Sequence, residues 1–160
     1  MVDAADKILD RKSLKEKVHS LRLEGKVVVF TNGCFDLLHV GHVRYLQKAR
    51  KQGDCLLVAV NSDSSVRQIK GPPRPIIPEG QRAEVVAALA CVDWVTIFDE
   101  PDPLILIKLL KPDALVKGSD WPEEKIVGAF EVKEAGGKVV RVQLVPGIST
   151  TTLIQKIRST

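Results

Sequence analysis

Short apolar runs and segments of helical periodicity alternate along this chain, and this alternation restricts the folds it can adopt. The predicted strands are Lys26–Thr31, Cys55–Asn61, Val92–Phe98, Ala114–Lys117 and Lys138–Val142. The predicted helices are Val40–Gln52, Glu79–Ala90, Pro103–Leu110, Glu123–Ala135 and Thr150–Arg158, with an additional helix over Ser13–Leu23. The strand segments are almost continuously apolar, as in strands buried on both faces. The sequence therefore predicts an α/β fold, a Rossmann-like parallel five-stranded sheet with helices on both faces.

The length of 160 residues predicts a single domain over 1–160, in which 1–25 form an N-terminal helical extension. The hydrophobic fraction of 44% and the charged fraction of 28% are typical of a globular protein. No segment approaches the roughly 20 apolar residues that cross a bilayer, and the N-terminus lacks the layout of a signal peptide. We therefore expect a cytoplasmic protein without a membrane partner.

The composition also bounds the partners. Aromatic residues make up only 4% of the chain, which leaves little from which to build a stacking surface for single-stranded nucleic acid. The net charge of +4 is mild and suits an anionic small molecule. The three cysteines, Cys34, Cys55 and Cys91, are widely spaced and form no C-x-x-C pair, so neither a disulfide framework nor a cysteine zinc site is expected. Cys34 lies beside the candidate site but has no evident paired base that would make it a nucleophile.

In a parallel sheet of this kind, ligands bind beyond the carboxyl ends of the strands. The loops after Thr31, Asn61, Phe98, Lys117 and Val142 are therefore expected to surround one site.

The loop after the first strand carries the strongest chemical signal, T-N-G-C-F-D-L-L-H-V-G-H over 31–42. It connects a strand to a helix, so free backbone N–H groups and the positive end of the helix point toward the site. Gly41 allows a phosphate to approach the first turn closely. His39 and His42 are three residues apart and can share one face of the helix, where two imidazoles can donate hydrogen bonds to a crowded phosphorus centre.

Other interpretations of the histidine pair remain open at this stage. His39 and His42 could ligate zinc, but no third Cys or His lies nearby and H-E-x-x-H is absent. A purely structural role is also possible. The chain has neither G-x-x-x-x-G-K-[ST] nor G-x-G-x-x-G, which excludes a P-loop enzyme and a dinucleotide oxidoreductase.

Two further segments are candidates for the site. G-I-S-T-T-T over 147–152 opens the last predicted helix, and its hydroxyl and N–H groups either cap the helix or hold the β- and γ-phosphates of a nucleotide. The segment Gly71–Pro78 contains four prolines and cannot be a helix or a central strand. It is either a stiff surface connection or a loop that covers the substrate and carries Lys70 and Arg74.

T-N-G-C-F-D-L-L-H-V-G-H and G-I-S-T-T together resemble the nucleotidyltransferase superfamily marked by H-x-G-H. From Val28 to Arg158 the chain is most similar to the adenylyltransferase domain of bacterial ADP-heptose synthesis. The residues that carry this narrower resemblance are V-N-S-D-S-S-V, I-K-G-P, Q-R-A-E-V-V, V-K-G-S-D-W and I-S-T-T-T-L-I-Q-K-I-R. Leu144-Val145-Pro146 stands where cytidylyltransferases for glycerol and choline phosphate have R-T-E, which counts against a glycerol phosphate acceptor.

The resemblance implies a role for each matching residue. The catalytic residues would be His39, His42 and Lys70. The nucleotide-binding residues would be Thr31, Asn32, Gly33, Phe35, Asp36, Gly41, Lys117, Gly118, Asp120, Trp121, Ser149, Thr150 and Thr151. The acceptor would meet Asn61, Asp63, Arg74 and Arg82. Within this set, Asp36 orders the first loop, and Lys117, Gly118, Asp120 and Trp121 line the nucleoside pocket.

The implied reaction transfers AMP from ATP to D-glycero-β-D-manno-heptose 1-phosphate, giving ADP-heptose and pyrophosphate. Mg²⁺ would be carried with ATP, and Asp36 is a candidate outer-shell partner. The implied partners are the small-molecule substrates, a second copy of the chain and a separate sugar kinase. Two alternatives remain: a cytidylyltransferase acting on another small phosphate or phosphonate, and a nucleotide-binding module without turnover.

Overall fold

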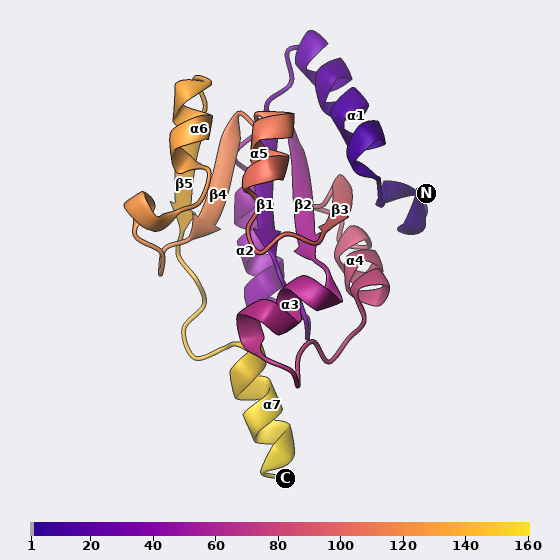
Figure 1. Ribbon diagram of the computed structural model, residues 1–160, viewed down its shortest axis with the longest axis vertical. Coiled ribbons are helices and arrows are strands. Elements are labelled where there is room, and N and C mark those ends of the chain that lie inside the picture. The colour runs from indigo at the N-terminus through magenta and orange to yellow at the C-terminus, as the bar shows by residue number, and fades with distance from the viewer. Residues whose placement is uncertain (1) are drawn as a thin grey trace.

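The computed structural model describes residues 2–160 and contains one five-stranded parallel sheet with strand order β3-β2-β1-β4-β5 (Figure 1). The strands are β1 Val28–Gly33, β2 Cys55–Asn61, β3 Trp94–Phe98, β4 Ala114–Gly118 and β5 Lys138–Val142. The α-helices are α1 Arg11–Leu23, α2 Val40–Arg50, α3 Asp63–Lys70, α4 Glu79–Ala87, α5 Leu104–Leu110, α6 Ala129–Glu134 and α7 Thr150–Arg158. The short 3₁₀ helices are η1 Ala5–Lys7 and η2 Glu123–Lys125. The predicted fold class is confirmed.

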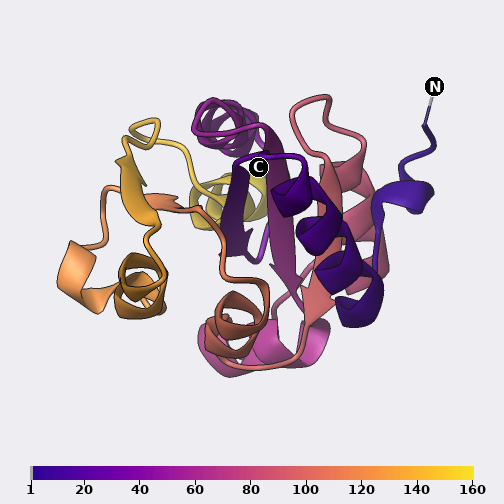
Figure 2. The same ribbon diagram turned by 90° about the horizontal axis from the view of Figure 1, so that it is seen from above.

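Helices cover both faces of the sheet, and successive strand residues contribute to different cores because strand side chains alternate between faces. Val29 packs in one core with Leu46 of α2 and Val86 of α4. Phe30, the next residue of β1, packs in the other core with helices α1, α5 and α6. Figure 2 shows the two layers on opposite sides of the sheet. This alternation determines which side of the sheet each strand-end residue faces.

The strand order changes direction at the centre of the sheet. From β1 the chain proceeds through β2 to the edge strand β3, and then returns to place β4 and β5 on the other side of β1. The carboxyl ends of β1 and β4 therefore diverge into different connections, and ligands of open α/β sheets bind in the crevice at such a point. The fold thus places the candidate site beyond β1 and β4.

Two helical regions differ from the prediction. The interval between β2 and the proline-rich segment, which was assigned no element, forms α3, because Ser62 accepts a hydrogen bond from the N–H of Ser65 and caps it. The predicted helix Glu123–Ala135 is divided into η2 and α6, because Gly128 adopts a left-handed backbone with φ of 86° and ends any continuous helix there.

Strands β2 and β5 and helix α7 have the predicted bounds. The other predicted elements differ from the structure only at their ends. Pairing with β2 begins at Val28 rather than Lys26. Val92 and Asp93 precede β3, and the Asp93 carboxylate accepts a hydrogen bond from the N–H of Leu56. Helices α2 and α4 end earlier than predicted, where the chain turns toward the next strand.

The segment predicted as an N-terminal extension packs against the domain. Leu14 and Val18 of α1 are buried in the second core. The Lys7 ammonium donates hydrogen bonds to the carbonyl oxygens of Ala87 and Val92, and Ile8 forms a parallel bridge with Val95 of β3. These contacts cover the outer edge of β3, which would otherwise present unpaired backbone groups.

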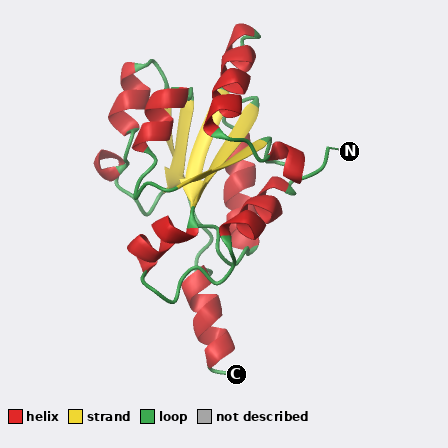
Figure 3. Cartoon of the chain, turned by 45° about the vertical axis from the view of Figure 1, so that its right-hand side comes forward, coloured by secondary structure: helices red, strands yellow, loops and turns green. Residues whose placement is uncertain are grey.

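Helix α7 extends away from the sheet at the C-terminus (Figure 3). Within residues 2–160, none of the α7 residues is buried. Only its N-terminal end lies against the rest of the domain. Within residues 2–160, no helix is both long enough and apolar enough to span a membrane.

Candidate active site

A cavity of about 590 Å³ lies at the carboxyl ends of the strands. Residues from the loops after all five strands line it, as the sheet topology predicts. Most of the predicted site residues line this cavity: Asn32, Gly33, Phe35, Asp36, His39, Gly41, His42, Asn61, Lys70, Arg74, Lys117, Gly118, Asp120, Trp121, Ser149, Thr150 and Thr151. Thr31, Asp63 and Arg82 are not among its lining residues.

The two histidines stack at the N-terminus of α2. His39 is the N-cap residue, and its carbonyl oxygen accepts a hydrogen bond of 2.9 Å from the N–H of His42. This turn brings the ring centroids to 3.8 Å with an angle of 20° between the planes. Phe35 contacts the His42 ring in an edge-on arrangement, with the ring centroids 5.3 Å apart. The pair is therefore held rigidly by its own backbone and by an aromatic neighbour.

Gly41 is required by this packing. A Cβ atom at Gly41 would lie 2.8 Å from the His39 ring and 3.1 Å from Ile148 Cγ2. Any side chain at position 41 would therefore displace His39 or the loop before α7. Because Gly41 has no side chain, the turn that carries the two histidines and the hydroxyl-bearing loop before α7 can approach each other closely.

Both histidines are neutral near pH 7. Burial lowers the pKa of His39, and burial together with the neighbouring His39 lowers the pKa of His42 to about 4. The Nδ1 atoms of both rings are buried and have no hydrogen-bond partner among residues 2–160. Two neutral imidazoles at a positive helix end can each donate one N–H hydrogen bond to an anionic ligand.

The second helix terminus at the cavity is that of α7. Ser149 is its N-cap, and the Ser149 Oγ accepts a hydrogen bond of 3.0 Å from the N–H of Thr152. The Thr150 hydroxyl contacts the carbonyl oxygen of Leu37 at 3.5 Å, which connects this loop to the loop before α2. Both interpretations of the G-I-S-T-T-T segment therefore coexist, because Ser149 caps the helix while the first turn of α7 faces the cavity.

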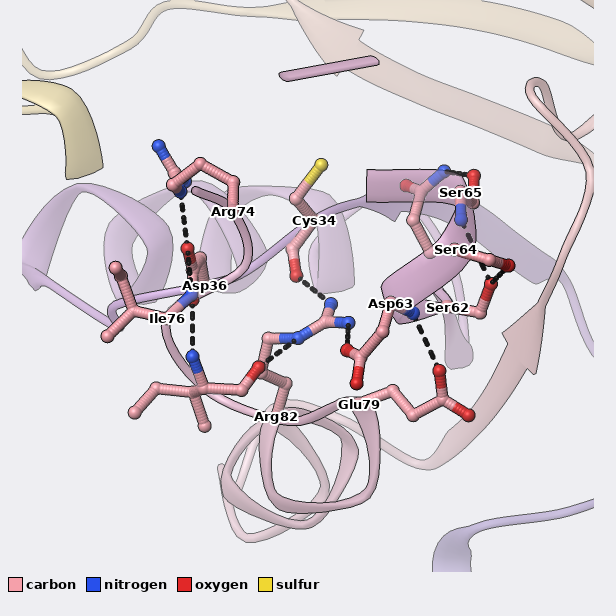
Figure 4. A network of polar contacts seen from close by, with 12 residues as sticks. Cys34, Asp36, Ser62, Asp63, Ser64, Ser65, Arg74, Ile76, Glu79 and Arg82 are labelled. Carbon is pink, nitrogen blue, oxygen red and sulfur yellow. Dashed lines mark hydrogen bonds and ion pairs between the residues drawn. The ribbon is translucent and has the colours of Figure 1, made fainter. Parts of the chain in front are cut away.

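Asp36 secures the proline-rich segment to the first loop (Figure 4). Its carboxylate accepts hydrogen bonds from the N–H groups of Ile76 and Ile77 and from the Nε of Arg74 at 2.6 Å. Burial raises the pKa of Asp36, but the N–H groups of Ile77 and Ile76 and the Arg74 guanidinium outweigh it and hold that pKa below its usual value. Asp36 thus orders the loop, and its oxygens are already engaged, which leaves it poorly suited to the outer shell of a metal ion.

Arg74 is partly aligned by this ion pair. Its Nε is directed to Asp36, and Figure 4 shows a terminal nitrogen of the guanidinium directed away from that carboxylate. Arg74 lines the cavity and is only 13% exposed. The segment Gly71–Pro78 is therefore attached to the site wall and presents a cation there.

Arg82 and Asp63 form a cross-link outside the cavity, and this differs from the contact with the acceptor that the resemblance implied. The Arg82 side chain is fully buried and donates to the carbonyl oxygens of Ile77 at 2.8 Å and Cys34 at 2.5 Å. Its third contact is an ion pair of 2.9 Å with Asp63. Figure 4 shows all three contacts converging on one guanidinium. Arg82 thus connects α4, the first loop and α3.

Thr31 also does not line the cavity. Its hydroxyl contacts the Tyr45 hydroxyl at 2.7 Å and donates to the carbonyl oxygen of Val116 at 3.0 Å. The Tyr45 ring lines the cavity from α2, and burial raises the pKa of its phenol. Thr31 therefore supports the site by holding β1, α2 and β4 together.

Lys117 lies in β4, which pairs with the central strand β1. It is partly buried at the end of β4, and its ammonium donates to Oδ1 of Asn32. Burial lowers the pKa of Lys117 to about 8. Gly118 follows, and a Cβ atom there would collide with Asp120 and approach Leu144 at 3.1 Å. The Trp121 side chain is 52% exposed and borders the cavity.

Sequence reasoning did not assign several apolar and polar wall residues. They are Cys34, Tyr45, Ile69, Pro101, Asp102, Pro103, Lys125, Ile126, Val127, Leu144, Val145 and Ile148. Cys34, Ile69 and Ile148 lie within the T-N-G-C, I-K-G-P and G-I-S-T-T segments, whereas no motif marks most of the others. Burial raises the pKa of the Cys34 thiol, which argues against the nucleophilic role considered for it. Among residues 2–160, no group of three or more His, Cys, Asp or Glu side chains is arranged to hold a metal ion.

With this geometry in place, comparison with known families identifies the chain. The cytidylyltransferase-like family matches residues 30–156, which include both histidines and the first turns of α7. The chain belongs to this family. The predicted nucleotidyltransferase class is thereby confirmed.

Named relatives extend this assignment. The bifunctional protein HldE of Syntrophotalea carbinolica is 55% identical over 151 residues, covering 94% of this chain and 31% of that protein. HldE of Geotalea uraniireducens is 54% identical, covering 98% of this chain and 32% of its own length. The chain thus spans about a third of the curated relatives it matches.

Solved structures agree with the fold. The lipopolysaccharide core biosynthesis protein from Thermoplasma volcanium GSS1 has a TM-score of 0.65 and 31% identity, covering 76% of this chain and 99% of its own. The pantoate–β-alanine ligase from Francisella tularensis has a TM-score of 0.60 and 16% identity, and the match covers 96% of this chain and 79% of the ligase chain. This likeness shows a shared fold only.

Proposed function

We propose that this chain transfers AMP from ATP to a sugar 1-phosphate, D-glycero-β-D-manno-heptose 1-phosphate, and releases pyrophosphate. A phosphate oxygen of the acceptor forms a bond to the α-phosphorus of ATP. The bond from that phosphorus to the bridging oxygen of the β-phosphate breaks, and pyrophosphate leaves with both electrons of that bond. The stacked His39–His42 pair at the N-terminus of α2, facing the first turn of α7, is the observation that carries this proposal.

The histidine pair suits the α-phosphate. The acceptor phosphate is already anionic, so no general base is needed, and catalysis depends on positioning and on stabilising the charge of the five-coordinate phosphorus. Neutral imidazoles can donate one N–H each without the cost of a buried pair of like charges. The N-termini of α2 and α7 both direct N–H groups at the cavity and suit the triphosphate between them.

Magnesium would be carried by the phosphates of ATP. Mg²⁺ typically keeps several waters and binds through substrate phosphates and few protein carboxylates. A cavity without a clustered set of carboxylates in residues 2–160 fits such a delivered ion. When bound, the ion would neutralise charge on the triphosphate.

The choice of acceptor rests on relatives. The proteins named HldE are 49% to 55% identical over most of this chain, and a solved relative is named for lipopolysaccharide core biosynthesis. Because those curated relatives are called bifunctional and are about three times as long, a sugar kinase is the proposed source of the sugar 1-phosphate. We further propose a cytoplasmic location, where ATP is available, and a homodimer.

A cytidylyltransferase is the second candidate, and the description of the matching family favours it. Pyrophosphate release with heptose 1-phosphate and Mg²⁺, measured in parallel with ATP and CTP, separates the two. Release with ATP alone is expected. Pyrophosphate release with CTP alone would support the cytidylyltransferase. If neither nucleotide gave pyrophosphate with any of a panel of sugar phosphates, the chain would be a nucleotide-binding module without turnover.

Lys70→Ala is expected to raise the Michaelis constant for a phosphate-bearing substrate by about tenfold, because a contact between an ammonium and a phosphate contributes on the order of 1.5 kcal/mol. Lys70 ends α3 and lines the cavity. Steady-state pyrophosphate release measures both Michaelis constants. Lys15→Ala, at an exposed lysine of α1, is the control. Unchanged constants for both substrates would remove Lys70 from the site.

A further inference from the structure

Three neighbouring strands end in polar side chains on the same face of the sheet. In β1, Val29 packs in the core beneath α2 and Phe30 packs in the core beneath α5. The Thr31 hydroxyl then meets Tyr45 of α2, so Asn32 faces the α5 side. The end of β1 thus directs Asn32 away from the helix that carries the histidines.

Strand β4 shows the same alternation. Val116 packs in the core beneath α2, whereas Leu115 packs in the core beneath α5. Lys117, two residues after Leu115, therefore faces the α5 side. Because Phe30 is aligned with Leu115, Asn32 and Lys117 lie at the same level, and their hydrogen bond agrees with this register.

Strand β2 supplies the third polar end. Val60 packs beneath α2 and Ala59 beneath α5, which directs Asn61 to the α5 side. The Asn61 amide donates to the hydroxyl of Ser65 in α3 at 3.0 Å. Asn61, Asn32 and Lys117 thus face the same side from β2, β1 and β4, and Asn61 lies two residues further along its strand than Asn32, which is aligned with Ala59. We call these three residues the polar row.

The cavity therefore has two sides. His39, His42 and the start of α7 lie on the α2 side, where Ile148 approaches Gly41. The polar row faces the other side, bordered by Ile69 of α3 and by the loop Pro101–Pro103 before α5. Figure 2 shows α3 (magenta) and α5 on the opposite side of the sheet from α2 (purple).

Lys117 lacks an anionic partner on this second side. Its ammonium donates to the neutral amide of Asn32, and no ion pair to a carboxylate is found for it among residues 2–160. A partly buried ammonium is costly unless an anion compensates it. In a cavity that holds two phosphate-bearing substrates, the second substrate can supply this anion.

We propose that Lys117 binds the phosphate group of the acceptor on the α5 side of the sheet, rather than lining the nucleoside pocket. This inference rests on the proposed nucleotidyl transfer. The ammonium would offset the charge of the incoming phosphate and so reduce its repulsion by the triphosphate, and Asn32 would orient the ammonium. Acceptors would thereby be restricted to phosphate or phosphonate monoesters.

Lys117→Met tests this assignment because methionine preserves length and removes the charge. With the sugar 1-phosphate that supports turnover in the wild type, the variant is expected to lose at least about 30-fold in kcat/KM for the acceptor, the scale of a hydrogen bond to a charged group. The dissociation constant for a non-hydrolysable ATP analogue should stay within about threefold. Lys117→Arg should recover part of the loss, because arginine keeps the charge.

A structural role predicts a different pattern. Lys117→Met is expected to unfold at a temperature equal to or above that of the wild type at pH 7, since it removes an uncompensated buried charge. A structural lysine would instead lower that temperature, and Lys117→Arg would not restore acceptor use selectively. Lys108→Met, at an exposed lysine paired with Glu131, is the control.

The acceptor's kcat/KM should also fall as the pH rises above about 8, where free Lys117 loses its proton. Cys34 and Asp120 raise this pKa, and Lys70 and Asp102 line the same cavity. Because a guanidinium keeps its proton at higher pH than an ammonium, the fall in kcat/KM should move to higher pH in Lys117→Arg. If Lys117→Met lost affinity for the ATP analogue as much as kcat/KM for the acceptor, Lys117 would be assigned to the nucleotide. An unchanged kcat/KM for the acceptor in this variant would overturn the proposal. A wild type without turnover on any sugar phosphate would instead contradict the proposed function itself.

Discussion

His42→Ala is expected to lower kcat by at least about 100-fold, because the loss of one preorganised donor to a developing phosphoryl charge typically costs that much. His42 stacks on His39 at 3.8 Å and is supported by Phe35, so its ring is fixed before substrate binds. The effect should be concentrated in kcat, since a donor to the transition state contributes less to the ground state.

Pyrophosphate release under saturating substrates measures this loss. The matched control is His19→Ala, at an exposed histidine of α1, for which turnover within about twofold of the wild type is expected. Circular dichroism and thermal unfolding check that the variant is folded. A folded His42→Ala enzyme with nearly normal kcat would refute the assignment of the histidine pair to the α-phosphate.

The pH dependence of stability gives an independent signature of the same pair. The folded-state pKa of His42 is about 4, below the ordinary value of 6.5, so the unfolded chain binds protons between these values that the folded site does not bind. The free energy of unfolding is therefore expected to fall as the pH is lowered from 6.5 toward 4. His42→Ala should show a smaller fall over this window.

The elements that sequence predicted well are those with a local signal. The apolar runs predicted β2 and β5 with the observed bounds, and the hydroxyl-rich start Ser149–Thr151 predicted α7. The histidine spacing at a strand-to-helix connection indicated His39 and His42 because three-residue spacing places both on one turn. The topology rule then predicted that loops distant in sequence meet at one edge of the sheet.

The remaining features depend on contacts that local patterns do not encode. Helix α3 is short and polar, and Ser62 and the packing of Val66 define it. Arg82 follows the motif of an acceptor-binding arginine, yet its guanidinium finds three acceptors inside the protein. Which face Lys117 occupies depends on strand register, which is fixed by pairing between β1 and β4 rather than by residue type.

Arg82→Met is expected to lower the free energy of unfolding by about 3 kcal/mol, because it removes a fully buried guanidinium and leaves two partly buried carbonyl oxygens and the Asp63 carboxylate without their donor. Asp63 is 28% exposed, so water relieves part of the cost on its side. Urea unfolding measures this change. Arg67→Met, at an exposed arginine of α3, should change stability by no more than about 0.5 kcal/mol.

The same variant separates a cross-link from a substrate contact. Arg82 holds the carbonyl of Cys34 in the first loop and that of Ile77 in the proline-rich segment, so its loss should loosen the site wall without removing a ligand of the substrate. At a temperature where Arg82→Met is fully folded, the Michaelis constants should therefore stay within about threefold of the wild type. A stable variant with a specific tenfold loss of affinity for the acceptor would instead return Arg82 to the binding site, which would require its buried guanidinium to exchange Asp63 for the substrate phosphate.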